Sequence, residues 1–281
     1  MLQLEYKGKG EKLSKFLTSA QCGLSYSSVQ KLFRKKDIKI NGERVNRDVM
    51  LSFGDKLQVY TTPEMLSCKD LEIVYDDDNI VVVNKPSGME VQSDAAKNVK
   101  AVLEKQLQKQ VFVCHRIDRN TKGLVIFAKN ENTYNELYKA FKNRTLEKHY
   151  LANVVGKPQK KADLKAFLFK DNKKSQVYIS DKKLPGYEPI ETKYTLVSQN
   201  GETAILDVEL VTGKTHQIRA HLAFVNLPIV GDGKYGKNEY NKKFKKTKQD
   251  LVAYKVIFHF DANSCLRYLD GKTIELKNVQ F

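Results

Sequence analysis

Several features typical of secreted or membrane proteins are missing from this chain of 281 residues. Its four cysteines (Cys22, Cys68, Cys114 and Cys265) are scattered and form no Cys-x-x-Cys pair, so a disulfide framework is not expected. No apolar run approaches the roughly 20 residues needed to span a bilayer, and the first residues lack the apolar core of a signal peptide. We therefore expect reduced thiols, a cytoplasmic location and no membrane partner.

Arginine is also scarce, although the chain is strongly basic. Only eight of the 49 lysine and arginine residues are arginines, and the formal net charge is +16 with a pI near 9.4. This charge favours a polyanionic partner, first a nucleic acid and second an anionic membrane surface. A lysine-rich composition can also arise without any such partner. Because lysine is the default cation here, the few arginines mark positions where a planar guanidinium is useful for pairing with carboxylates or phosphates.

The first 60 residues have the pattern of a small α/β unit. Apolar residues at helical spacing predict helices at 12–17 and 28–36. An alternating strand then ends in Asn41 and Gly42, which form a strong hairpin signal, and a Gly-Asp turn precedes one more strand. These elements predict two helices packed beside a short hairpin sheet.

This pattern resembles the alpha-L RNA-binding module first named in a small-subunit ribosomal protein. The matching segments are the paired helices, Ile-Lys-Ile-Asn-Gly and Gly-Asp-Lys-Leu-Gln-Val. We expect the module to cover residues 1–62 and a linker to follow at 63–70, because Thr-Thr-Pro breaks the periodicity there. A phosphate-binding face is expected on the second helix, and a solvated cationic face is the alternative. The basic residues of this face are Lys31, Arg34, Lys35 and Lys36.

Residues 71–281 have the pattern of one α+β domain. Strand patterns outnumber helical ones and seldom alternate with them, which predicts a mixed, largely antiparallel sheet with helices around it. Three carboxylates at 76–78 lie between two predicted strands, and a solvated hairpin turn is expected there rather than a metal site, since no second cluster has ligand spacing. Strands are predicted at 71–75, 80–84, 148–156, 176–180, 190–198, 203–211 and 252–260, and helices at 99–108 and 130–141.

The most informative segment is residues 115–129. Asp118 lies between Arg116 and Arg119, and an apolar run typical of a buried strand follows Gly123. Burying an unpaired ion costs several kcal/mol, so Asp118 either braces a turn or is kept ionised as a nucleophile or general base. Such charged strings are common on protein surfaces. The strand that follows favours catalysis, because it places the carboxylate at the mouth of a buried element.

A second segment, residues 212–222, predicts a strand end and a helix capped by Thr215. Arg219 is the arginine best placed to pair with a group elsewhere in the fold. His216 and His221 are five residues apart, about 140° around a helix, so they would not share a face as zinc ligands do. We expect packing or hydrogen-bonding roles for both histidines, and no metal site.

Two further segments have an open interpretation. The glycine-rich residues 228–236 allow a close backbone approach, as a phosphate cradle or as a plain loop. The basic run 237–248 contains two aromatic residues, which suits RNA contact with stacking and a solvated loop equally. Tyr150 by itself is most simply a packing residue, although Lys148 lies on the same strand face and the two can line a cleft.

Five of these segments, taken together and in order, resemble the RluA-type pseudouridine synthases. The departures from that family's motifs are Ile117 for a leucine, Lys122 for a serine and Lys214 for an arginine. The resemblance runs from about residue 70 to 260. The matching segments are Asn-Lys-Pro-Ser-Gly-Met at 84–89, His-Arg-Ile-Asp-Arg-Asn-Thr-Lys-Gly-Leu at 115–124, Lys-His-Tyr at 148–150, Gly-Lys-Thr-His-Gln-Ile-Arg-Ala-His at 213–221 and Pro-Ile-Val-Gly-Asp-Gly-Lys-Tyr-Gly at 228–236.

The resemblance implies isomerisation of uridine in RNA to pseudouridine on a flipped-out base, with no metal or organic cofactor. It implies that Asp118 is the nucleophile, that Tyr150 stacks on the uracil or acts as a base, and that Arg219 pairs with the carboxylate. It also implies that Arg116 fills the space that the base leaves. The other residues expected at the site are Arg119 and Lys148 for RNA binding, and His115, Thr121, Gly123, Ile218 and His216 around the substrate pocket.

Large-subunit ribosomal RNA is the expected substrate, because the N-terminal module suits structured RNA. Transfer RNA is the alternative substrate, and a non-catalytic RNA-binding factor in ribosome assembly is the rival function. No protein partner is evident. The clearest structural expectation is a direct ion pair between Asp118 and Arg219, with Tyr150 facing the same cleft.

Overall fold

The computed structural model describes residues 1–281 except 20, 21, 23, 25, 63–69, 95 and 96. It contains two compact units, which are residues 1–71 with 92–109 and residues 72–91 with 110–281. The predicted linker at 63–70 falls almost entirely outside the described residues, so the linker stays a prediction. No helix in the described parts of the chain is long and apolar enough to cross a membrane.

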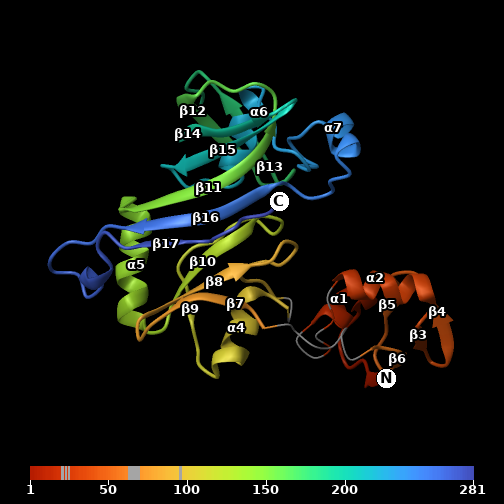
Figure 1. Ribbon diagram of the computed structural model, residues 1–281. Helices are drawn as coiled ribbons and strands as arrows, with labels where there is room; N and C mark the ends of the chain where they lie inside the picture. The colour runs from red at the N-terminus through yellow and green to blue at the C-terminus, as the bar shows by residue number, and fades with distance from the viewer. Residues whose placement is uncertain (20–21, 23, 25, 63–69, 95–96) are drawn as a thin grey trace. The chain divides into compact units, whose positions relative to one another are not determined.

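The first unit is built from helices beside a four-stranded sheet (Figure 1). Leu13 and Leu32, from the two predicted helices, are fully buried in its core with Ile38. Asn41 and Gly42 both have positive φ, as a two-residue hairpin turn requires. The elements are β1 (Leu2–Glu5), β2 (Glu11–Lys12), α1 (Leu13–Thr18), α2 (Tyr26–Lys35), β3 (Ile38–Ile40), β4 (Glu43–Val45), β5 (Met50–Leu51), β6 (Lys56–Val59) and α4 (Val99–Leu107).

The second unit is built on an eleven-stranded sheet, which confirms the expected mixed and largely antiparallel arrangement. Its strand order is β13-β12-β14-β15-β11-β16-β10-β8-β7, with β17 beside β16 and β9 beside β10. The pairing of β10 with β16 is parallel, and the other pairings are antiparallel. The strands are β7 (Glu72–Asp76), β8 (Ile80–Lys85), β9 (Phe112–Val113), β10 (Lys122–Ala128), β11 (Leu146–Val155), β12 (Lys161–Asp171), β13 (Gln176–Ser180), β14 (Glu188–Asn200), β15 (Thr203–Leu210), β16 (Leu251–Phe258) and β17 (Thr273–Glu275).

Three α-helices accompany this sheet. The first, α5 (Glu131–Asn143), is capped by Asn130 and packs against β9 and β10 (Figure 1). The second, α6 (Gln217–Phe224), packs across β12, β13 and β14, and the short α7 (Asn238–Lys243) follows it. The helix α6 therefore covers one face of the sheet, where the candidate site lies.

Alternation of apolar residues explains the central strands. In β11, Tyr150, Ala152 and Val154 are buried on the face that packs against Ile218 and Leu222 of α6. Each fully buried aliphatic side chain of this kind contributes about 1.5–3 kcal/mol. This packing fixes the position of α6 relative to β11.

The strand β12 was not predicted from the sequence. Its residues Ala166, Leu168 and Phe169 include apolar side chains on both faces, which hides the period of two. A hairpin turn joins β7 and β8 as expected, with Asp76 and Asp78 exposed. The carboxylate of Asp77 is not simply solvated, because it accepts hydrogen bonds from the Ile80 amide and the Tyr268 hydroxyl at 2.7 and 2.8 Å.

Candidate active site

The predicted ion pair between Asp118 and Arg219 is confirmed. Asp118 lies in the loop between β9 and β10, where its carbonyl accepts a hydrogen bond from the Thr121 amide at 3.1 Å. Arg219, 101 residues further along the chain, lies in the first turn of α6 and donates from Nη1 to Asp118 Oδ2 at 2.7 Å. The loop and the helix thus bring the two charges together.

One oxygen of the Asp118 carboxylate stays available. Oδ1 accepts no hydrogen bond from any residue that the structure describes, and 24% of the side chain is exposed. A carboxylate that is held through one oxygen and open at the other can attack an electrophile or accept a proton.

Arg219 is held in turn by a second carboxylate, that of Asp232. Nε donates to Asp232 Oδ2 at 2.7 Å and Nη2 donates to Oδ1 at 3.0 Å, a bidentate arrangement. Asp232 is fully buried, and its Oδ1 also accepts hydrogen bonds from the amides of Lys234 and Tyr235 at 2.8 and 3.1 Å. The result is a chain of three charges, Asp232, Arg219 and Asp118.

Asp232 is not among the site residues predicted from the sequence. Its signal was the Gly-Asp pair within the glycine-rich segment, where Gly231 has a φ of +79° and its backbone packs against the carbonyl of Lys248. The glycine therefore serves a close backbone approach, and the residue after it supplies the buried anion.

Asp232, Arg219 and Asp118 stabilise one another's charged forms. Burial by itself would lower the pKa of Arg219, but the hydrogen bonds and charges of Asp232 and Asp118 outweigh it and raise that pKa. Burial likewise opposes ionisation of Asp232, and the hydrogen bond and charge of Arg219 reverse this and lower its pKa. Both groups are thus charged at neutral pH.

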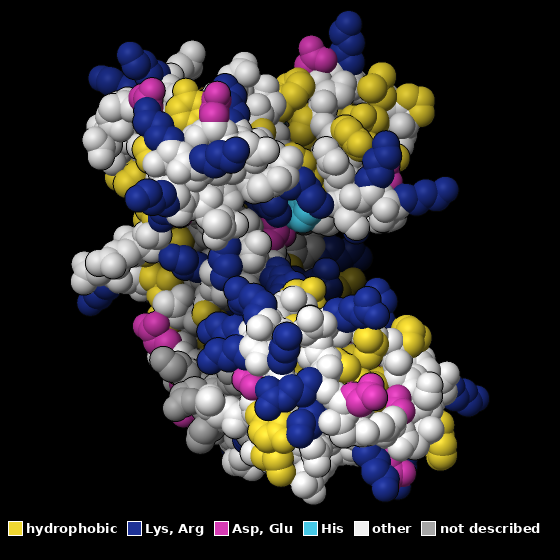
Figure 2. Space-filling view, turned by 90° about the vertical axis from the view of Figure 1, so that its right-hand side faces the viewer, with side chains coloured by type: hydrophobic (Ala, Val, Ile, Leu, Met, Phe, Trp, Pro, Cys, Tyr) yellow, Lys and Arg dark blue, Asp and Glu magenta, His cyan; other side chains and the backbone are white. Residues whose placement is uncertain are grey.

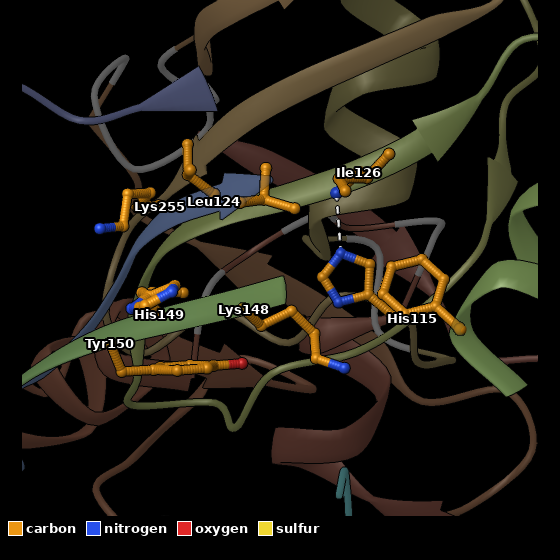
Figure 3. A pocket seen from close by; sticks show the side chains of 10 residues that line it. His115, Leu124, Ile126, Lys148, His149, Tyr150 and Lys255 are labelled. Carbon is orange, nitrogen blue, oxygen red and sulfur yellow. Dashed lines mark hydrogen bonds between the residues drawn. The ribbon is translucent and has the colours of Figure 1, made fainter. Parts of the chain in front are cut away.

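Tyr150 and Lys148 of β11 line a pocket whose wall also includes residues of β10 and β16. His115, Phe141 and Val256 also contribute to the wall of this pocket. Lys148 lies between Tyr150 and His115 (Figure 3), and burial lowers its pKa, helped by the charge of Arg144. Lys148 forms no ion pair within the described part of the chain, so its ammonium is available to an anionic ligand.

The phenol of Tyr150 is only 7% exposed. Burial raises its pKa, and the negative charge of Asp118 raises it further. Tyr150 is therefore protonated at neutral pH, and it interacts electrostatically with the carboxylate of Asp118.

His115 is a neutral wall residue of the pocket. Its Nε2 accepts a hydrogen bond from the Ile126 amide at 2.9 Å (Figure 3). Its ring stacks on Phe141 with centroids 4.5 Å apart. Burial lowers its pKa to about 3, and the charge of Lys148 adds to the shift. An imidazole fixed in this way lines the site and does not exchange protons near pH 7.

The two histidines of the second segment have the hydrogen-bonding roles expected of them. His216 Nδ1 lies 2.9 Å from the hydroxyl of Tyr235, and His221 Nδ1 lies 3.0 Å from that of Thr192. The predicted helix cap at Thr215 is wrong: His216 occupies the cap position with a φ of +53°. The Gln217 amide, one of the donors that a cap at Thr215 would bind, instead donates to the Lys214 carbonyl at 3.1 Å.

The two arginines that flank Asp118 in sequence do not pair with it. Arg116 is exposed, and Arg119 donates from Nε to the Gly88 carbonyl at 3.1 Å. Sequence adjacency placed these charges beside the carboxylate, but the side chains of neighbouring loop residues diverge, and the ion-pair partner comes from a distant helix.

Three other residues predicted around the substrate pocket do not line the pocket of Tyr150 and Lys148. Thr121 is buried and accepts from Gln249 Nε2 at 3.3 Å, while Ile218 belongs to the core under β11. Gly123 has a φ of +110°, and a Cβ there would lie 2.1 Å from the carbonyl oxygen of Ala253. Its glycine is thus explained by the parallel pairing of β10 with β16.

Lys85, at the end of β8, stabilises the Asp118 loop and was assigned no role from the sequence. Its fully buried ammonium donates to the carbonyls of Pro86, Met89 and Arg119 at 3.1, 2.8 and 3.0 Å. Burial lowers its pKa to about 7, and the negative charge of Asp118 opposes that shift. Lys85 therefore ties the loop after β8 to the loop that carries Asp118.

The donor set does not favour a resident metal. Both carboxylates of the site bind the guanidinium of Arg219, which occupies the position a cation would need. Within the described residues, no group of three histidine, cysteine or acidic side chains is arranged to hold a metal ion.

The predicted basic face of the first unit is exposed. Lys31, Arg34 and Lys35 lie on the outer side of α2, and Lys36 follows the helix with a φ of +55°. Figure 2 shows lysine and arginine side chains over much of the face that it draws, with few acidic ones between them.

Comparisons with known proteins agree on a family. The family model "RNA pseudouridylate synthase" matches residues 79–224. A protein of Mycoplasma capricolum called an uncharacterized RNA pseudouridine synthase is 31% identical over 96% of this chain and 94% of its own length. Ribosomal large subunit pseudouridine synthase C of Vibrio cholerae is 28% identical over 83% of this chain and 79% of its own.

A solved structure shares the fold. The human protein RNA pseudouridylate synthase domain containing 4 superimposes with a TM-score of 0.60 at 22% identity, covering 73% of this chain and 88% of the human one.

Proposed function

Because this chain belongs to the family of RNA pseudouridylate synthases, we propose that it isomerises uridine in ribosomal RNA with Asp118 as the catalytic nucleophile. The observation that carries the assignment of Asp118 is its ion pair with Arg219, which leaves Oδ1 open. The names of the relatives in Vibrio cholerae and Haemophilus ducreyi, both ribosomal large subunit synthases, support ribosomal RNA as the substrate.

The reaction breaks the N1–C1′ bond of uridine, turns the uracil and joins C5 to C1′; the hydrogen of C5 is lost as a proton, and N1 takes up a proton. The Asp118 carboxylate attacks the ribose or the uracil ring, or removes the C2′ proton. Each of these steps needs an ionised carboxylate with a free oxygen. Arg219 supplies the counter-charge without enclosing the carboxylate, because two of its nitrogens are bound to Asp232.

Tyr150 acts on the flipped base as a neutral phenol. Its raised pKa makes a tyrosinate base unfavourable near pH 7, and its ring lies in the wall of the pocket that Lys148 also lines. Packing against the uracil and donating a hydrogen bond are therefore the roles that its environment supports. Lys148, beside it, has an ammonium free for a phosphate of the same nucleotide.

Tritium release from ribosomal RNA labelled at C5 of uridine tests this proposal. Wild-type protein should release tritium, because C5 loses its hydrogen when it bonds to C1′. Asp118→Asn should reduce release by at least about 10³-fold, the scale on which loss of an essential catalytic group acts. It should still bind the RNA, since affinity comes mainly from phosphate contacts.

The control is Asp163→Asn, which alters an exposed carboxylate 3.8 Å from Lys165 and should leave release unchanged. Release by Asp118→Asn at the wild-type rate would reject the assignment. Release from transfer RNA but not from ribosomal RNA would show that transfer RNA is the substrate and would leave the proposed reaction unchanged.

The first unit is proposed to be an RNA-binding module over residues 1–62. Its support is the exposed basic face on α2 (Lys31, Arg34, Lys35 and Lys36), which no acidic side chain of the described residues neutralises within ion-pair distance. Changing these four residues to Gln should weaken RNA binding at low salt and lower the slope of log K against log[salt] by up to about three, since each phosphate contact contributes roughly 0.7–0.9. An unchanged slope would show that this face does not contact phosphates.

A further inference from the structure

The hairpin of β12 and β13 presents aromatic rings on the face of the sheet opposite α6. Leu168 and Val177 of this hairpin pack against Ala220 of α6, so the neighbouring Phe169 points the other way. Phe169 is 37% exposed, unusual for a large apolar side chain within a strand. Tyr178, its partner across the hairpin, lies on the same face.

A third aromatic ring, that of Tyr187, stacks on Phe169 and forms a pair with it. Tyr187, from the loop after β13, stacks on Phe169 with centroids 5.4 Å apart and planes at 25°. The loop is ordered by its own hydrogen bonds, since the Ser180 hydroxyl donates to the Lys182 carbonyl at 2.8 Å and the Tyr187 amide donates to Leu184 at 3.1 Å. The pair is thus held in place before any ligand arrives.

The surroundings of this pair are basic. Two of the nearby carboxylates are occupied: Asp171 accepts the Lys174 amide at 3.0 Å and Glu188 pairs with Lys214. The exposed lysines of the hairpin turn and of the loop after β13 that form no ion pair within the described part of the chain are Lys173, Lys174, Lys182 and Lys183.

We propose that Phe169 and Tyr187 form a stacking platform for unpaired nucleotides of the RNA substrate, with the surrounding lysines contacting its phosphates. Exposed rings among unpaired cations are the arrangement by which proteins hold single-stranded nucleic acid, because every base offers a π-face and every nucleotide a negative charge. The lysines favour this occupant over an apolar protein surface, which would leave their charges desolvated and unpaired.

The platform points away from the side of the sheet that carries Tyr150 and α6. It therefore serves to hold a part of the RNA other than the nucleotide that reacts. The proposal rests on RNA being the substrate and adds a second contact to it.

Because the chain contains no tryptophan, Phe169→Trp places the protein's single tryptophan at the platform, where its emission can be excited selectively. Titration with an unpaired oligonucleotide should quench its fluorescence in a saturable manner, since stacked bases quench indole emission. The matched control is Tyr138→Trp on α5, where the native ring is 53% exposed, and it should not be quenched. Quenching of Phe169→Trp by inorganic polyphosphate to the same extent would overturn stacking, because that anion has no bases.

A second variant, Phe169→Leu, measures what the platform contributes. It should lower affinity for an unpaired oligonucleotide by about tenfold, within the range found for single stacking contacts, with the thermal midpoint of unfolding unchanged. Unchanged affinity, in a preparation whose wild-type protein forms pseudouridine, would overturn the platform and leave the proposed function standing. Absence of pseudouridine with the wild-type protein would reject the function instead.

Discussion

Replacing Asp232 by Asn tests whether the second carboxylate positions the first through Arg219. The change keeps the size of the side chain, so no cavity forms, but it removes the charge from a fully buried site. If the amide oxygen takes the place of Oδ1, the bond from Nη2 at 3.0 Å is kept, and the NH₂ group takes the place of Oδ2, where it faces the Nε–H that donated at 2.7 Å. Breaking a buried ion pair on one side costs about 3–5 kcal/mol.

Two magnitudes follow. Asn retains one oxygen for the amides of Lys234 and Tyr235, so the lower end, about 3 kcal/mol, is the expected loss in the free energy of unfolding. At about 2–4 °C per kcal/mol for a unit of this size, the thermal midpoint falls by roughly 6–12 °C. In the reaction, loss of one charge-assisted hydrogen bond of about 1.5–3 kcal/mol predicts a rate about 10 to 150 times slower.

The assay is single-turnover tritium release at saturating RNA, beside thermal unfolding followed by circular dichroism. The expected result is a slower chemical step with nearly unchanged RNA affinity, because Asp232 is buried and cannot touch a phosphate. A lower midpoint with an unchanged rate would show that Asp232 serves folding alone. An unchanged thermal midpoint would contradict the expectation that breaking this buried ion pair destabilises the fold.

Two further expectations concern stability. Gly123→Ala should lower the free energy of unfolding by several kcal/mol in denaturant titrations. Residue 123 has a φ of +110°, and its added Cβ would lie 2.1 Å from the backbone oxygen of Ala253. Gly213→Ala, with open space around it, is the control, and equal effects of the two substitutions would refute the steric account. Burial lowers the pKa of His115 to about 3 and of His221 to about 4, below the ordinary 6.5, so the unfolded chain binds protons first and stability falls as the pH drops from 6.5 towards 4. A thermal midpoint as high at pH 5 as at pH 7.5 would contradict this.

Local patterns in the sequence sufficed for most elements. The strand at 176–180 has the bounds that its alternation predicts, and the hairpin at Asn41 and Gly42 forms because both residues tolerate positive φ. The strand β12 escaped prediction because apolar side chains on both faces, including Phe169, hide its period. Its exposed aromatic face could be recognised only once the position of α6 was known.

The sequence by itself indicated the residues that we propose to carry the chemistry. Asp118, Tyr150 and Arg219 were identifiable because their motifs occur in a fixed order, and the contact between the first and the last follows from that resemblance. Only the tertiary structure decided which charges meet. Arg116 and Arg119 adjoin Asp118 in the chain yet leave it unpaired, because loop side chains diverge.

The partner of Asp118 instead comes from a helix 101 residues away, and that helix is placed by the burial of Ile218 and Leu222 against β11. The role of Asp232 was decided in the same way, since a carboxylate becomes an anchor only where burial removes water and leaves a guanidinium as its partner. Ion-pair partners depend on packing at a distance, and single-residue patterns do not encode that.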